Sequence, residues 1–301
     1  MNLLITGAWA EAEANLPVLE AMGHSVAFLR QESDPLPCDP GWVEGAVCNG
    51  LFLSHPIEAF SALRWLQLTS AGTDRVDLDY VNRKGIVLHN ARGVYSLPMA
   101  EFALCGVLQL YKQAAFFRDN QRAHRWQKHR GLRELAGSTV LILGCGSVGT
   151  ACAERFAALG CRVLGVDLFP KPAAPFAAVH PLSGLDALLE QADVLILTLP
   201  LTEQTRGLMD ARRLGLLKPG AVLVNIARGP VVDEAALISA LRGGALSGAV
   251  LDVFAQEPLP AESPLWEMEQ VLLTPHNSFV GKNDAARLTR VILEHLSAFR
   301  S

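Results

Sequence analysis

Short apolar runs alternate with segments of helical period along most of the chain, an alternation typical of βαβ units that build a parallel sheet. In the first third, these runs predict strands near 3–6, 26–29, 46–48, 66–69 and 87–89. Further along, they predict strands near 140–143, 162–166, 178–180, 194–198, 222–226, 248–251 and 271–273. The pattern therefore predicts a small α/β unit followed by a longer α/β series.

Apolar residues at helical spacing predict helices between and after these strands. A long helix is expected to begin at Ser96, a candidate N-cap, and to connect two domains. Another is expected over 150–159, and a further one between Asp233 as N-cap and Gly243. The segment from about Asn283 onward is expected to form an amphipathic helix that packs back on earlier structure.

Composition excludes several other classes of protein. The 301 residues are 50% hydrophobic and 19% charged, which excludes a disordered or low-complexity chain and fits two domains. A net charge of -4 provides no general attraction to nucleic acid or to an anionic membrane, so neither partner is expected. The start shows no signal-peptide pattern and the six cysteines include no CxxC, so a cytoplasmic protein is expected. The histidines include no HxH or HExxH, and no metal site is expected.

One uncharged run, 135–153, has the length of a membrane span, but several glycines within it argue against that interpretation. Gly144, Gly146 and Gly149 form a GxGxxG between a predicted strand and a predicted helix, and Asp167 ends the next strand. This arrangement is the dinucleotide fingerprint, in which glycines permit a tight turn, close approach of a pyrophosphate and close helix packing. Asp167 would accept hydrogen bonds from a ribose 2′-hydroxyl and repel a 2′-phosphate. NAD is therefore favoured over NADP, a preference that the nearby Lys171 would soften.

Three ionisable side chains follow late strands of the longer series, namely Arg228, Glu257 and His276. Ligands bind outside the carboxyl ends of parallel strands, so these three can converge on one site. A histidine that titrates near neutrality can exchange a proton with an alcohol, and a carboxylate can orient it and stabilise its protonated form. A guanidinium can bind a carboxylate and polarise the adjacent oxygen. Each residue alone is also typical of a solvated loop, and only their common placement favours hydride-transfer chemistry.

Long segments of the chain resemble the D-isomer-specific 2-hydroxyacid dehydrogenase family from about 66 to 280. They are LILGCGSVGTACAERFAALGCRVLGVD, ADVLILTLPLTEQTRGLM, LKPGAVLVNIARGPVVDEAALISAL, SGAVLDVFAQEPLP and SPLWEMEQVLLTPHNSF. The resemblance implies a Rossmann doubly wound parallel sheet domain, 97–275, inserted into a smaller flavodoxin-like α/β substrate domain, 1–96 plus 276–301. It also implies D-stereospecific hydride transfer between NAD(H) and a small 2-hydroxy or 2-oxo acid, in a cleft between the domains.

The resemblance further implies roles for individual residues. The catalytic set is Arg228, Glu257 and His276. The glycine loop, with Ser147 and Val148, would contact the pyrophosphate of the cofactor. Pro200 and the backbone of Ile226 and Ala227 would lie beside the cofactor, and Asp252 would lie at the nicotinamide carboxamide. The substrate carboxylate would bind the backbone of Ser70, Ala71 and Gly72, together with Arg228. The first 60 residues match the family less well. There, the position of Leu51 and Phe52 after the third predicted strand, rather than the resemblance, places them near the substrate side chain, where they favour an apolar or aromatic group.

The segment 118–133 is rich in Arg and Lys, and it is expected to be a solvated helix face rather than a nucleic-acid site. In similar dehydrogenases this segment lies at a dimer contact, so the resemblance implies a homodimer in which Trp126 helps to line the substrate pocket. Two other functions fit the same sequence. One is an NAD(H)-sensing binding protein, like the corepressors that share this fold, and the other is oxidation of a non-carbon substrate such as phosphite.

Overall fold

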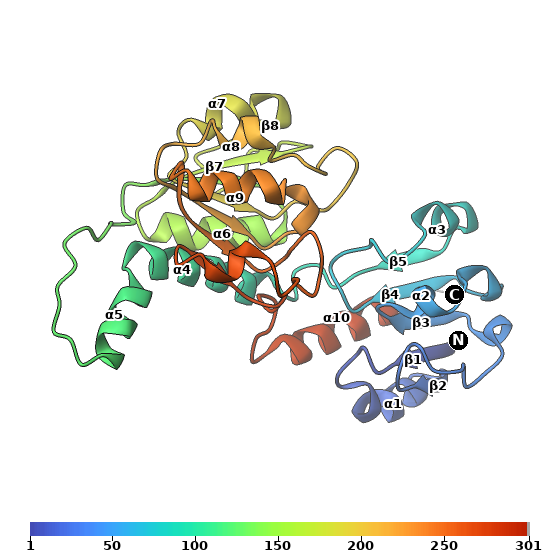
Figure 1. Cartoon of the computed structure of the whole chain (residues 1–301). Helices are drawn as coiled ribbons and strands as arrows, with labels where there is room; N and C mark the ends of the chain where they lie inside the picture. The colour runs from blue at the N-terminus through green and yellow to red at the C-terminus, as the bar shows by residue number, and fades with distance from the viewer. Residues whose placement is uncertain (300–301) are drawn as a thin grey trace. The chain divides into compact units, whose positions relative to one another are not determined.

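The computed structural model describes residues 1–299, which divide into two units (Figure 1). The smaller unit comprises Met1–Tyr95 and the segment from Gly281 onward, and the larger unit comprises Ser96–Val280. Residues 276–280 therefore belong to the larger unit, whereas the sequence places them in the substrate domain. The reason is local, because this segment is hydrogen-bonded to the strand end at Asp252.

The smaller unit contains a five-stranded parallel sheet with the strand order β2-β1-β3-β4-β5. Its strands are β1 (Asn2–Thr6), β2 (Ser25–Leu29), β3 (Gly45–Cys48), β4 (Trp65–Leu68) and β5 (Val87–His89). Alternate residues of each strand face opposite sides of the sheet. Both sides are buried, which explains why these strands appear in the sequence as short continuous apolar runs.

Helices cover both faces of the smaller sheet. They are α1 (Ala12–Ala21), α2 (Leu51–Ser54), α3 (Leu78–Lys84) and α10 (Asp284–Ala298), with short 3-10 turns at Pro40–Trp42 and Ile57–Ala59. One face carries Leu3 and Ile5, which pack with Leu288 and Ile292 of α10 and with α1. The amphipathic helix predicted after Asn283 is confirmed, and its apolar stripe completes the core of the N-terminal sheet.

The larger unit contains a seven-stranded parallel sheet with the order β12-β11-β10-β9-β6-β7-β8. Its strands are β6 (Thr139–Leu143), β7 (Arg162–Asp167), β8 (Ala178–Pro181), β9 (Val194–Leu197), β10 (Ala221–Asn225), β11 (Leu246–Leu251) and β12 (Val271–Leu273). The chain reverses its direction of strand addition between β6 and β9. In a doubly wound sheet this switch point opens a crevice at the carboxyl ends of the strands, where ligands bind.

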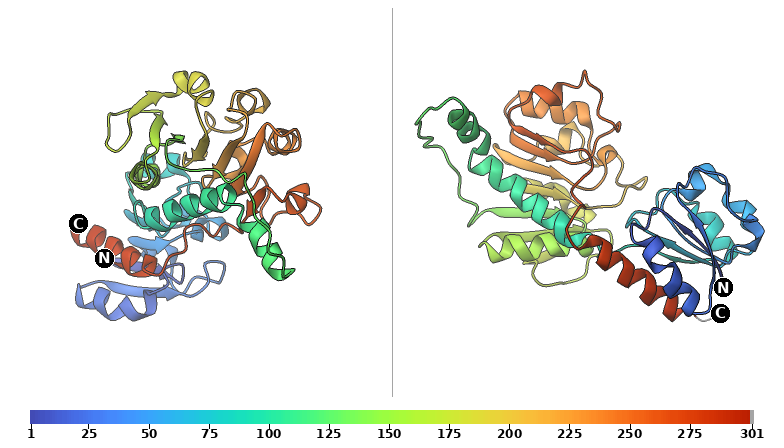
Figure 2. Two further views of the ribbon diagram at one scale, coloured as in Figure 1. Left: turned by 90° about the vertical axis from the view of Figure 1, so that its left-hand side faces the viewer. Right: turned by 90° about the horizontal axis from the view of Figure 1, so that it is seen from below.

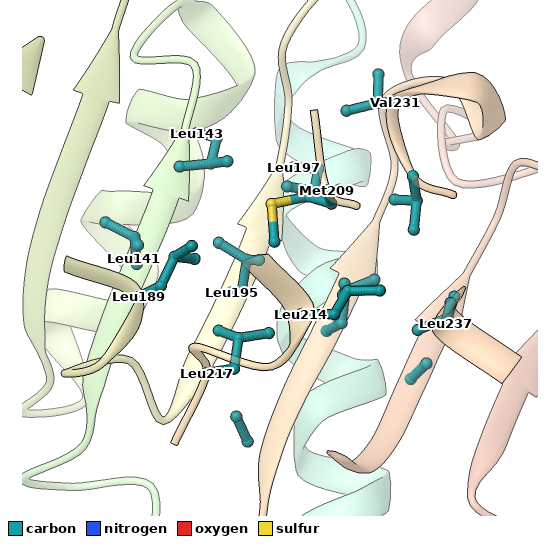
Figure 3. Packing of buried hydrophobic residues seen from close by; sticks show 14 of the residues in the cluster. Leu141, Leu143, Leu189, Leu195, Leu197, Met209, Leu214, Leu217, Val231 and Leu237 are labelled. Atoms are coloured by element: carbon teal, nitrogen blue, oxygen red, sulfur yellow. The ribbon is translucent and has the colours of Figure 1, made fainter. Parts of the chain in front are cut away.

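The helices of the larger unit form a layer on each side of its sheet. They are α4 (Ser96–Tyr111), α5 (Ala114–Arg122), α6 (Ser147–Ala158), α7 (Leu185–Leu189), α8 (Ala211–Leu214) and α9 (Glu234–Arg242), with 3-10 turns at Leu182–Gly184, Gly229–Val231 and Pro264–Glu267. Figure 2 shows α4 and α6 side by side, and they bury Val140 and Ile142 of β6. The alternate residues Leu141 and Leu143 pack on the opposite side with residues of α7, α8 and α9 (Figure 3).

The predicted strands agree with the observed ones to within two residues, and both ends of the helix between Asp233 and Gly243 are confirmed. The basic segment differs from the prediction of a helix face, because α5 ends at Arg122 and no helix or strand covers 123–134. His124 has a φ of 52°, a left-handed conformation that interrupts the helix. Among the described residues, no helix is both long and apolar enough to span a bilayer.

Candidate active site

The carboxyl ends of β11 and β12 bring Glu257 and His276 together. Glu257 lies in the loop after β11, and His276 follows β12 by three residues. The Nδ1 atom of His276 lies 2.8 Å from Oε2 of Glu257, and each side chain is a little more than one third exposed. Because Glu257 occupies Nδ1, the other ring nitrogen, Nε2, is left for proton exchange with a ligand. The pairing expected from the sequence is therefore present as a geometric contact.

Asp252, at the end of β11, holds the loop that carries His276. Its carboxylate is buried and accepts hydrogen bonds from the hydroxyl of Thr274 (2.6 Å) and the backbone N–H groups of Asn277 (2.7 Å) and Ser278 (2.9 Å). The N–H of His276 donates to the Asp252 carbonyl at 2.8 Å. His276 has a φ of 51°, which is strained for a residue with a Cβ and persists only where surrounding contacts enforce it. Asp252 thus has a positioning role here, and its contact with a nicotinamide carboxamide stays a prediction.

Arg228 follows the neighbouring strand β10, and its backbone is fixed by contacts of the residues around it. The side-chain amide of Asn225 donates to the Arg228 carbonyl at 3.1 Å, and the Arg228 guanidinium donates to the Ala227 carbonyl at 2.8 Å. A Cβ on Gly229 would lie 1.9 Å from the backbone of Phe254, so only glycine permits this approach. Phe254 N–H in turn donates to Glu257 at 3.1 Å, which joins the Arg228 segment to the loop that carries Glu257.

The glycine loop adopts the turn that its sequence predicts. Gly144 has a φ of 99°, and its N–H donates to the Val166 carbonyl at 2.8 Å. A Cβ on Gly149 would lie 1.9 Å from the Gly144 carbonyl oxygen, so the third glycine is required for close packing of α6. A Cβ on Gly146 would meet nothing within 4 Å, which leaves open space in front of the second glycine. No side chain caps the first turn of α6, so its N–H groups are available to an anion.

Asp167 lies at the end of β7, directly beside this loop. One carboxylate oxygen accepts from the Cys145 N–H at 2.8 Å, and the other accepts from the Phe169 N–H at 2.9 Å. Burial and the charge of Asp167 raise the pKa of Cys145 to about 12, so this thiol stays protonated and does not act as a nucleophile. The carboxylate of Asp167 is thus held in place beside the glycine loop, and its contact with a cofactor ribose stays a prediction.

The remaining cofactor residues lie at the carboxyl ends of β9 and β10. Pro200 is exposed three residues after β9, and its carbonyl accepts from the Thr205 hydroxyl at 2.7 Å. Ile226 and Ala227 are buried directly after β10, so their backbone rather than their side chains can face a ligand. Together with the space at Gly146 and the carboxylate of Asp167, these positions form one edge of the larger sheet that fits a nicotinamide dinucleotide.

The segment Ser70–Gly72 lies in the smaller unit, after β4. Its carbonyls are engaged: Asn90 Nδ2 donates to Ala71 at 2.8 Å, Ala91 N–H donates to Ser70 at 2.9 Å, and Ser70 Oγ donates to Gly72 at 2.9 Å. Within residues 1–299, the N–H groups of Ala71 and Gly72 make no such bond. The loop therefore presents open backbone donors of the kind that bind a carboxylate.

Leu51 and Phe52 have packing roles in the structure. Leu51 is fully buried in the core beneath β3, and Phe52 meets Phe60 edge to face at a centroid distance of 5.5 Å. Phe52 keeps partial exposure, so only Phe52 of this pair presents surface in this conformation. The predicted contact of these two residues with a substrate side chain is untested.

The sequence pattern missed several polar groups that build the site. Thr198 supports the glycine loop by donating to the Gly144 carbonyl at 2.7 Å, and Asn225 and Thr274 fasten the loops of Arg228 and His276. Their only sequence signal is a polar residue at the end of an apolar strand. In the described part of the chain, no group of three or more His, Cys, Asp or Glu side chains is placed to hold a metal ion.

Residues 104–278 match the model of the D-isomer specific 2-hydroxyacid dehydrogenase NAD-binding domain. The D-3-phosphoglycerate dehydrogenase of Mycobacterium tuberculosis is 38% identical over 73% of this chain but only 42% of its own length. The chain thus spans less than half of that relative. Glyoxylate/hydroxypyruvate reductase B of Yersinia enterocolitica is 36% identical over 77% of this chain and 73% of the relative.

Solved structures extend the match to nearly the whole chain. A D-isomer specific 2-hydroxyacid dehydrogenase family protein from Aeromonas salmonicida has a TM-score of 0.85 and 34% identity, covering 99% of this chain and 96% of its own. A family member from Xanthobacter autotrophicus, solved with NADPH and MES, has a TM-score of 0.77 and 34% identity over 98% and 95%. D-lactate dehydrogenase from Aquifex aeolicus, solved with NAD and lactic acid, has a TM-score of 0.81 and 25% identity over 99% and 95%. Fold, site geometry and sequence agree: this chain belongs to the D-isomer specific 2-hydroxyacid dehydrogenase family.

Proposed function

We propose that this protein is an NAD-dependent dehydrogenase that transfers hydride, with D-stereospecificity, between the cofactor and a small 2-hydroxy or 2-oxo acid. The observation that carries the proposal is the His276–Glu257 pair, joined at 2.8 Å on the edge of a sheet that also bears the dinucleotide loop. A proton donor beside a nicotinamide site is what reduction of a ketone requires. Family membership and the activities of the relatives support the same chemistry.

In the reductive direction, the protonated imidazole of His276 donates its Nε2 proton to the substrate oxygen as that oxygen gains charge. A bound NADH supplies the hydride. The carboxylate of Glu257 stabilises the imidazolium and keeps Nδ1 occupied, so the proton is delivered from the other nitrogen. The guanidinium of Arg228 binds the substrate carboxylate and polarises the carbonyl, because a planar cation suits both oxygens. In the oxidative direction, neutral His276 accepts the hydroxyl proton.

The assay of this proposal is NADH consumption by the full chain with glyoxylate, pyruvate, hydroxypyruvate, phenylpyruvate and 2-oxoisocaproate. At least one acid should be turned over well above background. If Phe52 contacts the substrate side chain, kcat/KM should be higher for 2-oxoisocaproate and phenylpyruvate than for glyoxylate. Binding of NADH without turnover of any acid would contradict the proposed activity and favour a cofactor-sensing protein.

We also propose NAD rather than NADP as the working cofactor. Asp167 supports this preference, since its carboxylate is held beside the glycine loop by two backbone donors and would repel a 2′-phosphate. The variant Asp167→Ser should lower the ratio of kcat/KM for NADH to that for NADPH at least tenfold, whereas Asp34→Ser, at an exposed loop position, should leave it unchanged. A preference of the unmodified protein for NADPH would overturn the role given to Asp167.

We also propose that two copies of the chain form a homodimer through α5 and residues 123–134. Trp126 is 98% exposed and Phe117 is 38% exposed, and apolar side chains exposed on one segment are typical of an interface. The ends of the segment are fastened, since Lys112 Nζ donates to the Arg133 carbonyl at 2.6 Å and the Arg133 guanidinium lies 4.1 Å from the Tyr111 ring centroid. Residues 114–134, called the arm below, are thus held at both ends and would contact a second copy of the chain.

Light scattering after gel filtration tests the dimer. The mass should be twice 32.4 kDa, and the double variant Phe117→Asp, Trp126→Asp should shift it toward one copy. Phe169→Asp is the matched control, because Phe169 is 80% exposed outside the arm. A single-copy mass for the unmodified protein would contradict the proposal. The cytoplasmic location stays a prediction from the sequence.

A further inference from the structure

A cavity of about 420 Å³ lies in the smaller unit, at the carboxyl end of β5. Its walls come from the loop after β4, from β5 and the turn that follows it, and from α10. The lining residues are Thr73, Leu88, His89, Asn90, Arg92, Val291 and His295. None of the seven is acidic, and in the described part of the chain Arg92 forms no ion pair. Its volume lies within the range of small-molecule sites, and its ionisable side chains are all basic.

Two histidines stack in the wall of this cavity. The rings of His89 and His295 are 4.2 Å apart between centroids, with planes at 19°. The Nδ1 atom of His295 lies 2.7 Å from Oε1 of Gln67, which is fully buried and donates its own amide to the Leu68 carbonyl at 2.8 Å. Since Gln67 offers an oxygen, Nδ1 of His295 carries a hydrogen, and Nε2 is the nitrogen left for a ligand.

Within residues 1–299, neither histidine of this pair contacts a carboxylate. Burial, and next the charge of His295, lower the pKa of His89, because two stacked imidazolium rings repel each other. The nearest acid in sequence to the lining residues of the loop is Asp74, which is engaged in another interaction, and Glu294 on α10 is exposed. An anion in the cavity would supply the missing counter-charge to both rings and to Arg92.

The cavity also borders the loop with open backbone donors. Asn90 lines the cavity and donates to the Ala71 carbonyl at 2.8 Å, while its Oδ1 accepts from the Arg92 N–H at 3.2 Å. Ala91 N–H donates to the Ser70 carbonyl at 2.9 Å. The turn that carries Arg92 is therefore hydrogen-bonded directly to the loop Ser70–Gly72, and Thr73, next in the chain, is itself part of the wall.

We propose that this cavity binds a small molecule carrying a dianionic tetrahedral group, such as a phosphoryl group, through Arg92 and the His89–His295 pair. Leu88 and Val291 provide apolar wall for the body of that molecule. Occupation changes the KM for the 2-oxo acid, because the ligand and the Ser70–Gly72 loop share the turn at 90–92. This second statement rests on the proposed dehydrogenase function, whereas the binding itself does not.

Calorimetric titration of the intact protein with sulfate tests the binding, because sulfate stays doubly charged across the working pH range. One sulfate per chain should bind saturably at pH 6.0. The affinity should fall severalfold by pH 7.5, because the His89 ring, whose pKa lies below its usual value of 6.5, is then uncharged. Arg92→Gln and His295→Gln should each weaken binding about tenfold or more. Arg83→Gln and His180→Gln are the matched controls, since neither residue lines the cavity.

Three results would overturn the site: no saturable binding, equal affinity in Arg92→Gln and the unmodified protein, or equal affinity for acetate. His276→Ala should bind sulfate as the unmodified protein does, and loss of binding in that variant would place the anion at the catalytic pair instead. In the assay, sulfate should change the KM for glyoxylate severalfold in the unmodified protein and not in Arg92→Gln. Absence of turnover with every acid would contradict the enzyme and leave the calorimetric result to decide the site.

Discussion

Two histidines of this protein make nearly the same hydrogen bond to chemically different partners. In the larger unit, Nδ1 of His276 lies 2.8 Å from a carboxylate oxygen of Glu257. In the smaller unit, Nδ1 of His295 lies 2.7 Å from an amide oxygen of Gln67. Both contacts fix the ring and leave Nε2 for other work. Only the carboxylate stabilises a charged ring, so the first pair is suited to proton transfer and the second to recognition of an external anion.

The surroundings of the two rings differ in the same way. His276 has a strained backbone conformation that the buried carboxylate of Asp252 enforces. Asp252 therefore fixes its backbone, and Glu257 fixes its ring. His295 lies on a regular helix, and the ring stacked on it in the wall of the cavity is a second histidine. Strain and an internal counter-charge therefore distinguish the histidine that we propose as the proton donor from the one that we propose as part of an anion site.

The largest expected effect comes from removing the ring of His276, the proposed proton donor. His276→Ala should lower kcat for 2-oxo acid reduction by about 10²- to 10⁴-fold, because the proton donor is lost. Binding of NADH, measured by fluorescence, should be nearly unchanged. His180→Gln, at a half-buried position on the edge strand β8, is the control. Undiminished turnover by His276→Ala would show that His276 is not the proton donor, and it would contradict the contrast drawn between His276 and His295.

Glu257→Gln gives His276 the same kind of partner that His295 already has. A hydrogen bond to a charged group contributes about 1.5–3 kcal/mol, so kcat should fall about 10- to 100-fold. The imidazolium loses its counter-charge, so the change should fall on kcat far more than on the KM for the 2-oxo acid. An unchanged kcat for Glu257→Gln in steady-state kinetics would show that the charge of the carboxylate is not needed and that it only holds the ring.

The glycine loop separates binding from folding on the same edge of the larger sheet. Gly146→Ala adds a methyl where the protein has no atom within 4 Å, so the fold should be retained while NADH affinity falls about tenfold. Gly149→Ala adds a methyl 1.9 Å from the Gly144 carbonyl oxygen and should lower the free energy of unfolding by about 1–3 kcal/mol. Titration with NADH and urea denaturation distinguish the two. Equal behaviour of both variants would contradict the assignment of the open space to a pyrophosphate.

The smallest expected effect is on stability, and it comes from the stacked pair of His89 and His295. The pKa of His89 is lowered in the folded protein, from a usual value of 6.5, so acid favours the unfolded chain, which binds this proton more readily. The stabilisation is present above about pH 6.5 and is lost as the pH falls below it. His89→Gln should therefore flatten the decline of the thermal midpoint between pH 7.5 and 5.5 by about 1–2 °C. If differential scanning calorimetry shows that the thermal midpoint of His89→Gln declines as steeply as that of the unmodified protein, His89 does not contribute to the loss of stability in acid.

Most of the fold follows from local pattern. The strands are predictable because both faces of each parallel sheet are buried, which makes each strand a short apolar run between helical segments. The ends of α9 are predictable because Asp233 accepts from the Ala236 N–H and Gly243 follows the last turn. The irregular arm after Arg122 is not, because its polar residues suit a helix and its path depends on anchors at Tyr111 and Arg133.

The candidate site is predictable only in part. The glycine loop, Asp167 and the three strand-end residues follow from spacing, because parallel strands deliver their carboxyl ends to one edge. The supporting contacts of Thr198 and Asp252 depend on which strands become neighbours, and sequence alone does not specify that order. The same holds for His295, whose partner Gln67 lies on a strand near the other end of the chain.

The helix α10 imposes an order on the making of this protein. It covers Leu3 and Ile5 of the first strand, yet it is encoded after the whole of the larger unit. In a chain emerging from a ribosome, the part of this face that α10 covers therefore stays exposed until α10 has been translated, while the inserted unit already has all of its own elements. Leu3 and Ile5 thus gain their contacts with α10 only after the whole of the larger unit has been translated.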